Sequence, residues 1–303
     1  MKVLIADKIA KEGIEKLKNA GFEVVEAWEA PKEQLPELIK DCDAIIVRSA
    51  TKVTKALIDA APKLKVIGRA GVGLDNVDAE HAKAKGVKVV NTPEATSRSV
   101  AELAIGLMIA AARGIGYGTA TMAAGKWEKK ALEGVELGGK TLGLIGIGRI
   151  GSETAKLALA MGMKVIAFRK SARDTGIPGV TVVSSLDELL ASADFISIHV
   201  PLSPETKNMI GAKELAKCKD GVIIVNCARG GIVDEDALYE ALRRGKVRAA
   251  GIDVYAEEPP VGIHKLATLP NVALTPHIGA QTHEGQQRAG VQIAERVIEA
   301  LRS

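Results

Sequence analysis

Three side chains suited to proton transfer and anion binding follow three apolar, strand-like runs in the second half of the chain. Arg229 comes just after the run 222–226, Glu258 a few residues past the run 249–254, and His277 just after the run 271–275. An arginine can pair bidentately with a carboxylate and polarise the adjacent carbonyl. A histidine can exchange a hydroxyl proton, while a glutamate holds its ring and raises its pKa. With a nicotinamide, this set would suffice for hydride exchange with a 2-hydroxy acid.

Each of these residues, taken alone, is also ordinary in a surface loop. Loop arginines are usually solvated, a Pro-His pair is found in turns, and glutamate before proline is a common loop composition. Their shared position favours the functional interpretation, because a doubly wound parallel sheet binds its ligands at the carboxyl ends of its strands.

A glycine-rich turn supplies the expected cofactor site. The segment 141–151 reads TLGLIGIGRIG, in which Gly146, Gly148 and Gly151 form G-x-G-x-x-G between a strand-like run and a helical run that extends to Met161. A second strand is expected at Lys164–Phe168, which completes a βαβ unit. The glycines allow the turn, the approach of a pyrophosphate and close helix packing, whereas an ordinary βα turn is the alternative.

The end of that second strand carries cations where an NAD site normally has an acidic residue. Arg169 and Lys170 are followed by Ser171 and Arg173. A guanidinium and an ammonium would bind a 2′-phosphate that a carboxylate would repel, so the sequence favours NADP(H), with NAD as the alternative. In the other interpretation these cations lie in a solvated loop and Asp174 bonds the ribose, although Asp174 comes several residues late.

Further cofactor-binding positions are expected beside the glycine turn and at the strand ends. They are Arg149, Ile150, His199, Val200, Pro201, Cys227, Ala228, Asp253 and Gly279. Asp253 is expected to serve the carboxamide of the cofactor, and His199 to line its pocket rather than to transfer a proton. We expect His81, His264 and His283 to be surface residues.

Composition excludes several classes of function. The 303 residues are 47% hydrophobic and 26% charged, with a net charge of +4, and the basic residues are interleaved with acidic ones. Nucleic-acid binding through a basic face is therefore not supported. No signal peptide and no apolar run long enough to span a bilayer is evident. The cysteines, at 42, 218 and 227, are far apart, which indicates a reduced cytoplasmic protein without structural disulfides or a metal site.

Strand-like and helix-like runs alternate along the chain, which predicts an α/β fold of two doubly wound parallel sheets. Strands are expected at 2–6, 22–26, 44–47, 65–68, 87–90, 194–199, 222–226, 249–254 and 271–275. Helices are expected at 10–19, 32–40, 54–60, 78–85, 185–192, 212–217 and 235–244.

Asn91–Ser99 is expected to cross between the two domains, and it precedes a long apolar helix at Val100–Ala112 and the Gly-rich run GIGYG. The segment Tyr117–Leu137 then leads to the glycine turn. An arm of this kind often dimerises, and burial within one subunit is the alternative.

Six motifs resemble the D-isomer-specific 2-hydroxyacid dehydrogenase family over nearly the whole chain. They are IVRSATKVT from Ile46, RAGVGLDNVD from Arg69, SVAELAIGLMIAAAR from Ser99, NCARGGIVDEDAL from Asn226, GIDVYAEEPP from Gly251 and TPHIGA from Thr275. The resemblance implies a Rossmann cofactor domain, residues 95–281, inserted in a flavodoxin-like substrate domain, residues 1–94 plus 282–303. It also implies a C-terminal helix, Glu284–Leu301, that returns to the first domain, and a homodimer built through the cofactor domain.

The same resemblance implies roles for individual residues. Arg229, Glu258 and His277 occupy the catalytic positions, with Arg229 and His277 also in contact with substrate. The substrate positions are Arg48, Ser49, Arg69, Ala70, Gly71, Val72, Gly73 and Asp75, with the two arginines facing a phosphate. The implied reaction is the oxidation of D-3-phosphoglycerate to 3-phosphohydroxypyruvate, which feeds serine synthesis, or its reverse. We expect the domains to hinge near 91–99 and 275–283.

Two departures from the family pattern matter. The sequence ends at Ser303, so the regulatory serine-binding domains of longer members are not expected, and Arg169 replaces the usual aspartate. The alternatives are an NADP-dependent reductase of glyoxylate or hydroxypyruvate and, from a different functional class, a dinucleotide-sensing corepressor. Turnover separates a sensor from an enzyme, and the need for Arg48 separates the two substrate classes.

Overall fold

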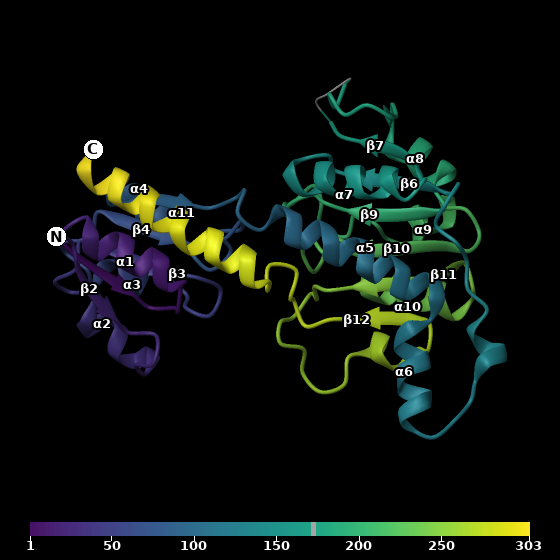
Figure 1. Ribbon diagram of the computed structural model, residues 1–303, viewed down its shortest axis with the longest axis horizontal. Coiled ribbons are helices and arrows are strands. Elements are labelled where there is room, and N and C mark those ends of the chain that lie inside the picture. The colour runs from purple at the N-terminus through teal and green to yellow at the C-terminus, as the bar shows by residue number, and fades with distance from the viewer. Residues whose placement is uncertain (171–173) are drawn as a thin grey trace. The chain divides into compact units, whose positions relative to one another are not determined.

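The computed structural model describes residues 1–170 and 174–303, and its internal contacts divide the chain into two compact units. Unit 1 comprises Met1–Ser97 and Ala280–Ser303, and unit 2 comprises Arg98–Gly279. Over the described residues, unit 1 contains a five-stranded sheet and unit 2 a seven-stranded sheet, with parallel pairing throughout both ladders (Figure 1). The predicted α/β fold with two doubly wound parallel sheets is confirmed.

The sheet of unit 1 has the strand order β2-β1-β3-β4-β5, in which the chain reverses direction across the sheet after β1 and β2. Its elements are β1 (Lys2–Ile5), α1 (Lys11–Asn19), β2 (Glu23–Glu26), η1 (Lys32–Gln34), α2 (Leu35–Leu38), β3 (Ala44–Val47), α3 (Lys55–Asp59), β4 (Val66–Arg69), α4 (Ala79–Ala84), β5 (Lys88–Asn91) and α11 (His283–Arg302). The central strand β3 reads AIIV and is buried throughout, as expected for a parallel strand covered on both faces.

The C-terminal helix α11 packs against α1 and β4 of unit 1. Thr282 begins the helix by accepting the Gly285 N–H at 3.0 Å. Glycine sets the contact with α1, because a Cβ added at Gly13 would lie 2.3 Å from the Gly290 carbonyl oxygen. The ends of the sequence therefore belong to one unit, and the yellow helix in Figure 1 lies beside the purple N-terminal elements.

The sheet of unit 2 has the order β12-β11-β10-β9-β6-β7-β8 over its described residues. Its elements are α5 (Ser97–Arg113), α6 (Ile115–Ala123), η2 (Lys129–Leu132), β6 (Thr141–Ile145), α7 (Arg149–Ala160), β7 (Lys164–Phe168), β8 (Val180–Val182), α8 (Leu186–Ser192), β9 (Phe195–Ile198), α9 (Ala212–Lys217), β10 (Val222–Asn226), α10 (Glu235–Arg243), β11 (Val247–Ile252), η3 (Lys265–Thr268) and β12 (Val272–Leu274). The direction of winding reverses between β6 and β9, which is the position where such sheets bind nucleotides.

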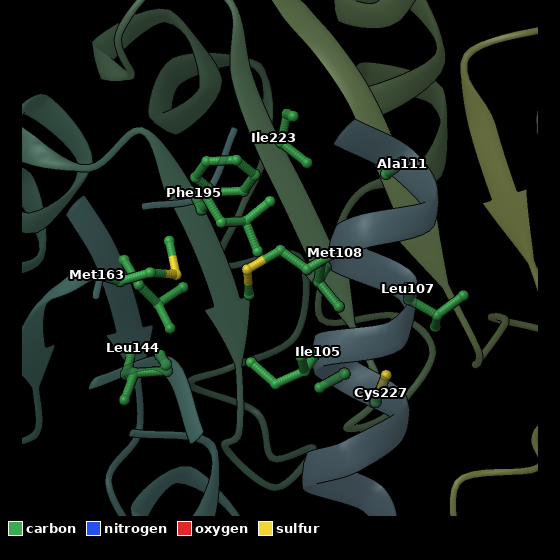
Figure 2. Packing of buried hydrophobic residues seen from close by; sticks show 14 of the residues in the cluster. Ile105, Leu107, Met108, Ala111, Leu144, Met163, Phe195, Ile223 and Cys227 are labelled. Carbon is green, nitrogen blue, oxygen red and sulfur yellow. The ribbon is translucent and has the colours of Figure 1, made fainter. Parts of the chain in front are cut away.

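The apolar helix α5 covers one face of this sheet. Figure 2 shows Ile105 and Met108 pointing from the helix toward the sheet, with Met108 directed toward Phe195 on β9, and these residues belong to one buried cluster. Met108 and Phe195 are at most 1% exposed. This cluster packs α5 against the strands whose carboxyl ends carry the candidate site.

The structure differs from the sequence-based elements in three places. The single helix predicted at 32–40 is a 3₁₀ turn followed by the short helix α2, with Pro36 in its first turn, where the missing N–H costs nothing. The Gly-rich run after α5, to which no element was assigned from the sequence, contains the start of α6, which begins at Ile115 after a break at Gly114 with φ +61°. The short edge strand β8 was not predicted.

Among the described residues, no single helix is long and apolar enough to cross a bilayer, and α5 and α6 reach the required length and apolar composition only when they are taken together, with a bend of 65° between them.

Candidate functional site

The glycine turn lies between β6 and α7, and its three glycines meet three different requirements. Gly146 has φ +96°, a conformation that side chains other than glycine rarely adopt. A Cβ at Gly151 would lie 2.4 Å from the Gly146 carbonyl oxygen, so the helix packs against the turn itself. At Gly148, by contrast, a Cβ would meet no described atom within 4 Å. The turn thus leaves free space at the glycine that a pyrophosphate approaches, and the residues present fit a dinucleotide.

His199 lies directly behind this turn, at the end of β9. Its backbone N–H donates to the Ile145 carbonyl at 2.7 Å, and its Nε2 is 2.9 Å from the Ser197 hydroxyl. Its Nδ1 is buried without a hydrogen-bond partner among the described residues. Burial lowers the pKa of His199 to about 4, so the ring is neutral near pH 7. A neutral ring suits a pocket lining and is a poor proton donor.

Arg169 and Lys170 follow β7 directly and are exposed. Ser171 and Arg173, which the sequence analysis placed in the same cationic run, lie outside the described residues. The carboxylate of Asp174 accepts the Gly176 N–H at 3.0 Å and so caps its own turn. This hydrogen bond occupies one carboxylate oxygen of Asp174, the alternative ligand for the ribose.

The candidate proton-transfer pair, His277 and Glu258, lies within unit 2. His277 Nδ1 lies 2.6 Å from Glu258 Oε2, and Glu258 Oε1 accepts the Tyr255 N–H at 2.9 Å. A carboxylate only accepts, so Nδ1 carries a proton and Nε2 is the nitrogen available for exchange. The hydrogen bond to Glu258 raises the pKa of His277, and the charge of Asp253 adds to it against opposing burial. Burial pushes the pKa of Glu258 upward, but its bonds to His277 and Tyr255 outweigh this and lower it.

Asp253, at the end of β11, fixes the loop that carries His277. It is fully buried, and its carboxylate accepts the Thr275 hydroxyl at 2.7 Å and the N–H groups of Ile278 and Gly279 at 2.8 and 2.9 Å. Its own carbonyl accepts the His277 N–H at 2.8 Å. These bonds hold His277 at φ +52°, a conformation that is uncommon for this residue type.

The loop after β10 carries Arg229 and packs on the loop that carries Glu258. Asn226 folds it, because its side chain accepts the Ala228 N–H and donates to the Arg229 carbonyl, both at 3.0 Å. A Cβ at Gly230 would lie 1.7 Å from the Tyr255 carbonyl oxygen. Only a glycine at position 230 permits this approach, and the charge of Arg229 contributes to the pKa shifts of both Glu258 and His277. The three candidate catalytic residues thus lie together in unit 2.

The candidate substrate residues lie in unit 1. Arg69 ends β4, and Arg48 follows β3, where Val47 pairs with Arg69. The Arg69 guanidinium lies against Gly71, because a Cβ there would be 1.7 Å from Arg69 Nη1. The loop of Ala70, Val72, Gly73 and Asp75 continues from β4, and Asn91 donates to the Val72 carbonyl at 2.6 Å. Burial lowers the pKa of Arg48.

The remaining cofactor positions follow their predicted strands. Val200 and Pro201 come after β9, Cys227 and Ala228 after β10, Gly279 after β12, and Arg149 and Ile150 begin α7. Cys227 is buried, which raises the pKa of its thiol. Among the described residues, no group of three or more His, Cys, Asp or Glu side chains could hold a metal ion.

Two histidines expected on the surface are mostly buried and paired. His264 is 14% exposed, bonds Glu235 at 3.0 Å and packs edge-on to Tyr255, while His81 is 17% exposed and bonds Asp59. The pairing of these two side chains was not predicted, because a histidine in a polar stretch gives no sign of a distant partner. Sequence reasoning also missed Asn226, although its place at the end of the strand before Arg229 was a usable signal.

Residues 105–279 match the family described as D-isomer specific 2-hydroxyacid dehydrogenase, NAD binding domain. The chain is 51% identical to a D-3-phosphoglycerate dehydrogenase of Methanocaldococcus jannaschii, covering 100% of this chain and 58% of that protein. It is also 51% identical to a hydroxypyruvate reductase of Thermotoga maritima, covering 99% of this chain and 98% of that protein. A glyoxylate reductase structure from Paecilomyes thermophila superposes with a TM-score of 0.89 at 35% identity, covering 100% of this chain and 96% of that one.

Proposed function

Because the chain belongs to the D-isomer-specific 2-hydroxyacid dehydrogenase family, a family of NAD(P)-dependent oxidoreductases, we propose that its substrate pair is D-3-phosphoglycerate and 3-phosphohydroxypyruvate. The observation that carries this choice is the pair Arg48 and Arg69 at the carboxyl ends of adjacent strands. Two guanidinium groups supply charge-assisted donors for a phosphate that an unphosphorylated hydroxy acid lacks.

In this proposal, the residues of unit 2 perform proton transfer and carboxylate binding. The protonated Nε2 of His277 donates to the carbonyl oxygen during reduction and takes the proton back during oxidation. Glu258 keeps Nδ1 protonated and stabilises the imidazolium, and Arg229 orients the substrate carboxylate. A bound nicotinamide dinucleotide supplies or accepts the hydride at C2. Gly146, Gly148 and Gly151, with the start of α7, would hold its pyrophosphate.

The preferred cofactor in this proposal is NADP(H). It is supported by the exposed cations Arg169 and Lys170 after β7 and by the local turn that engages Asp174. The test is the initial rate of 3-phosphohydroxypyruvate reduction with NADPH and with NADH, compared as kcat/KM. A preference for NADPH that Arg169→Asp reverses would support the proposal, and a preference for NADH in the unaltered protein would overturn it.

An NADP-dependent reduction of hydroxypyruvate or glyoxylate is the second candidate. It is favoured by the Thermotoga maritima hydroxypyruvate reductase, which matches this chain over 98% of its own length. The two candidates differ in their use of Arg48. Arg48→Ala should raise the KM for 3-phosphohydroxypyruvate about 10- to 100-fold if a phosphate binds there. An unchanged KM, together with faster turnover of hydroxypyruvate, would favour the second candidate.

We also propose a homodimer built through the cofactor-binding unit. Its support is the exposed apolar surface of α6 and the segment after it, where Ile115, Met122 and Trp127 are 50%, 57% and 78% exposed. Light scattering coupled to gel filtration tests the assembly. Trp127→Lys together with Met122→Lys should convert a dimer to a monomer, whereas a monomeric unaltered protein would overturn the proposal.

A further inference from the structure

A short segment of unit 1, Arg48–Thr51, is held at both ends by side chains from elsewhere in the unit. Asp7 follows β1, and its Oδ2 accepts the N–H groups of Arg48 at 2.7 Å and Thr51 at 3.0 Å. Its Oδ1 accepts the Thr51 hydroxyl at 2.6 Å. One carboxylate thus binds the donors at the first and last residues of the segment.

Asn76 binds the acceptors of the same two residues. Its Nδ2 donates to the carbonyl of Arg48 at 2.8 Å and to that of Thr51 at 2.6 Å. Both protons of the amide are used in this way. The backbone of Asn76 continues the contact, since its carbonyl accepts the Val53 N–H at 2.8 Å. We call Asp7 and Asn76 the clamp, because together they bind the N–H and C=O groups at both ends of the segment.

The surroundings of the clamp favour the ionised form of Asp7. Asp7 is 6% exposed, and burial alone would raise its pKa, but the bonds from Thr51, the backbone N–H of Arg48 and Lys32 lower it. Lys32 Nζ lies 3.2 Å from Asp7 Oδ1 and 2.5 Å from the Thr51 hydroxyl. The carboxylate is therefore ionised at neutral pH and has a cation beside it.

The clamp leaves the side chain of Arg48 largely uncommitted. Among the described residues, its guanidinium donates only to two neutral oxygens at long distances, the Lys8 carbonyl at 3.4 Å and Gln281 Oε1 at 3.2 Å. A guanidinium has five N–H donors, so it retains capacity for an anion. The backbone from which this side chain extends is fixed, whereas the side chain is held weakly.

We propose that Asp7 and Asn76 are positioning residues that orient Arg48 toward the phosphate of the substrate. The inference rests on the proposed function and deepens it, because it names the groups that preorganise the second anion site. Neither residue touches the phosphate in this scheme. Fixing the segment in advance removes the ordering that an anion would otherwise have to impose when it binds.

The test compares Asn76→Ala with the unaltered protein on 3-phosphohydroxypyruvate and on hydroxypyruvate, which lacks the phosphate. We expect the KM for the phosphorylated substrate to rise about tenfold, with kcat changed less than about twofold and the Kd for NADPH unchanged. The KM for hydroxypyruvate should stay within about twofold. A merely structural role would not produce this selective change. Asn271→Ala is the matched control, because it removes a similar bond, to the Arg248 carbonyl at 2.9 Å, in the other unit.

Asp7→Asn is the second variant, for the case in which Asn76→Ala does not fold. Asparagine preserves the shape of the side chain at position 7, and the loss of the charge should also speed hydrogen exchange at the amides of Arg48 and Thr51. Arg48→Ala distinguishes a failure of the clamp from a failure of the proposed function. If Arg48→Ala raises the KM for the phosphorylated substrate and neither clamp variant does, the clamp is refuted while the proposed function stands. If Arg48→Ala has no such effect, the phosphate assignment fails first and the positioning role fails with it.

Discussion

Replacing Glu258 with glutamine should move the pH dependence of reduction to lower pH. Glutamine can still accept a hydrogen bond from His277 Nδ1, so the geometry at 2.6 Å can be kept while the negative charge is lost. In the proposed mechanism reduction requires a protonated His277, so kcat/KM is expected to be constant at low pH and to fall as pH rises through the pKa of that residue. Because Glu258 raises this pKa, its neutral replacement lowers the midpoint.

The size of the shift follows from the exposure of the pair. A hydrogen bond to a charged group is worth about 1.5–3 kcal/mol when it is shielded from water. The side chains of His277 and Glu258 are 45% and 34% exposed, so solvent reduces the charge-dependent part. If the charge-dependent interaction between the two side chains is worth about 1 kcal/mol, near the upper end for exposed pairs, the midpoint should shift by about 0.7 pH unit.

The assay is kcat/KM for 3-phosphohydroxypyruvate at a fixed saturating NADPH concentration across the neutral pH range. Glu257→Gln is the matched control, because it removes the adjacent exposed carboxylate and so changes the net charge equally. An unchanged midpoint in Glu258→Gln, or an equal shift in Glu257→Gln, would contradict this prediction. Either result would mean that the pair seen in the structure does not set the protonation of His277.

Three further predictions concern the glycine turn, the core and the clamp. Gly148→Ala should weaken NADPH binding, measured by fluorescence titration, about tenfold without lowering Tm, because the added Cβ meets open space in the protein but stands where the pyrophosphate approaches. Gly151→Ala, whose Cβ would lie 2.4 Å from a carbonyl oxygen, should lower Tm, and the reverse pattern would contradict both. Met108→Ala truncates a fully buried side chain and should reduce the free energy of unfolding by about 2–5 kcal/mol in urea; a loss below about 1 kcal/mol would contradict the packing in Figure 2. Because the pKa of Asp7 is lowered in the folded protein, its ionised carboxylate stabilises the fold at pH values above the unfolded pKa of about 3.9, and this stabilisation is lost as pH falls through the folded pKa. The difference in free energy of unfolding between the unaltered protein and Asp7→Asn should therefore be smaller at about pH 3 than at about pH 6. A difference that does not change with pH would contradict this prediction.

The sequence predicted most of the fold because its local signals agree with one another. The runs at 44–47, 164–168 and 222–226 match strands β3, β7 and β10 in both bounds. Buried parallel strands read as continuous β-branched runs, and the helices between them show their own period, so neither needs a distant partner to be identified. Where Pro36 interrupts a helical run or a strand has three residues, as in β8, the local signal is too short to fix the element.

The residues that follow each strand can also be identified from the sequence alone, which predicted that Arg229, Glu258 and His277 lie at one edge of a sheet. It could not show the bonds that hold them, such as those from the backbone N–H groups of residues 278 and 279 to the carboxylate of Asp253. The sequence also did not predict that His264 pairs with Glu235, or that Asp7 and Asn76 both bind the segment Arg48–Thr51. Periodicity and turn chemistry act over a few residues, whereas these contacts join residues 25 to 44 positions apart in the chain, and only the folded chain determines which distant polar groups meet.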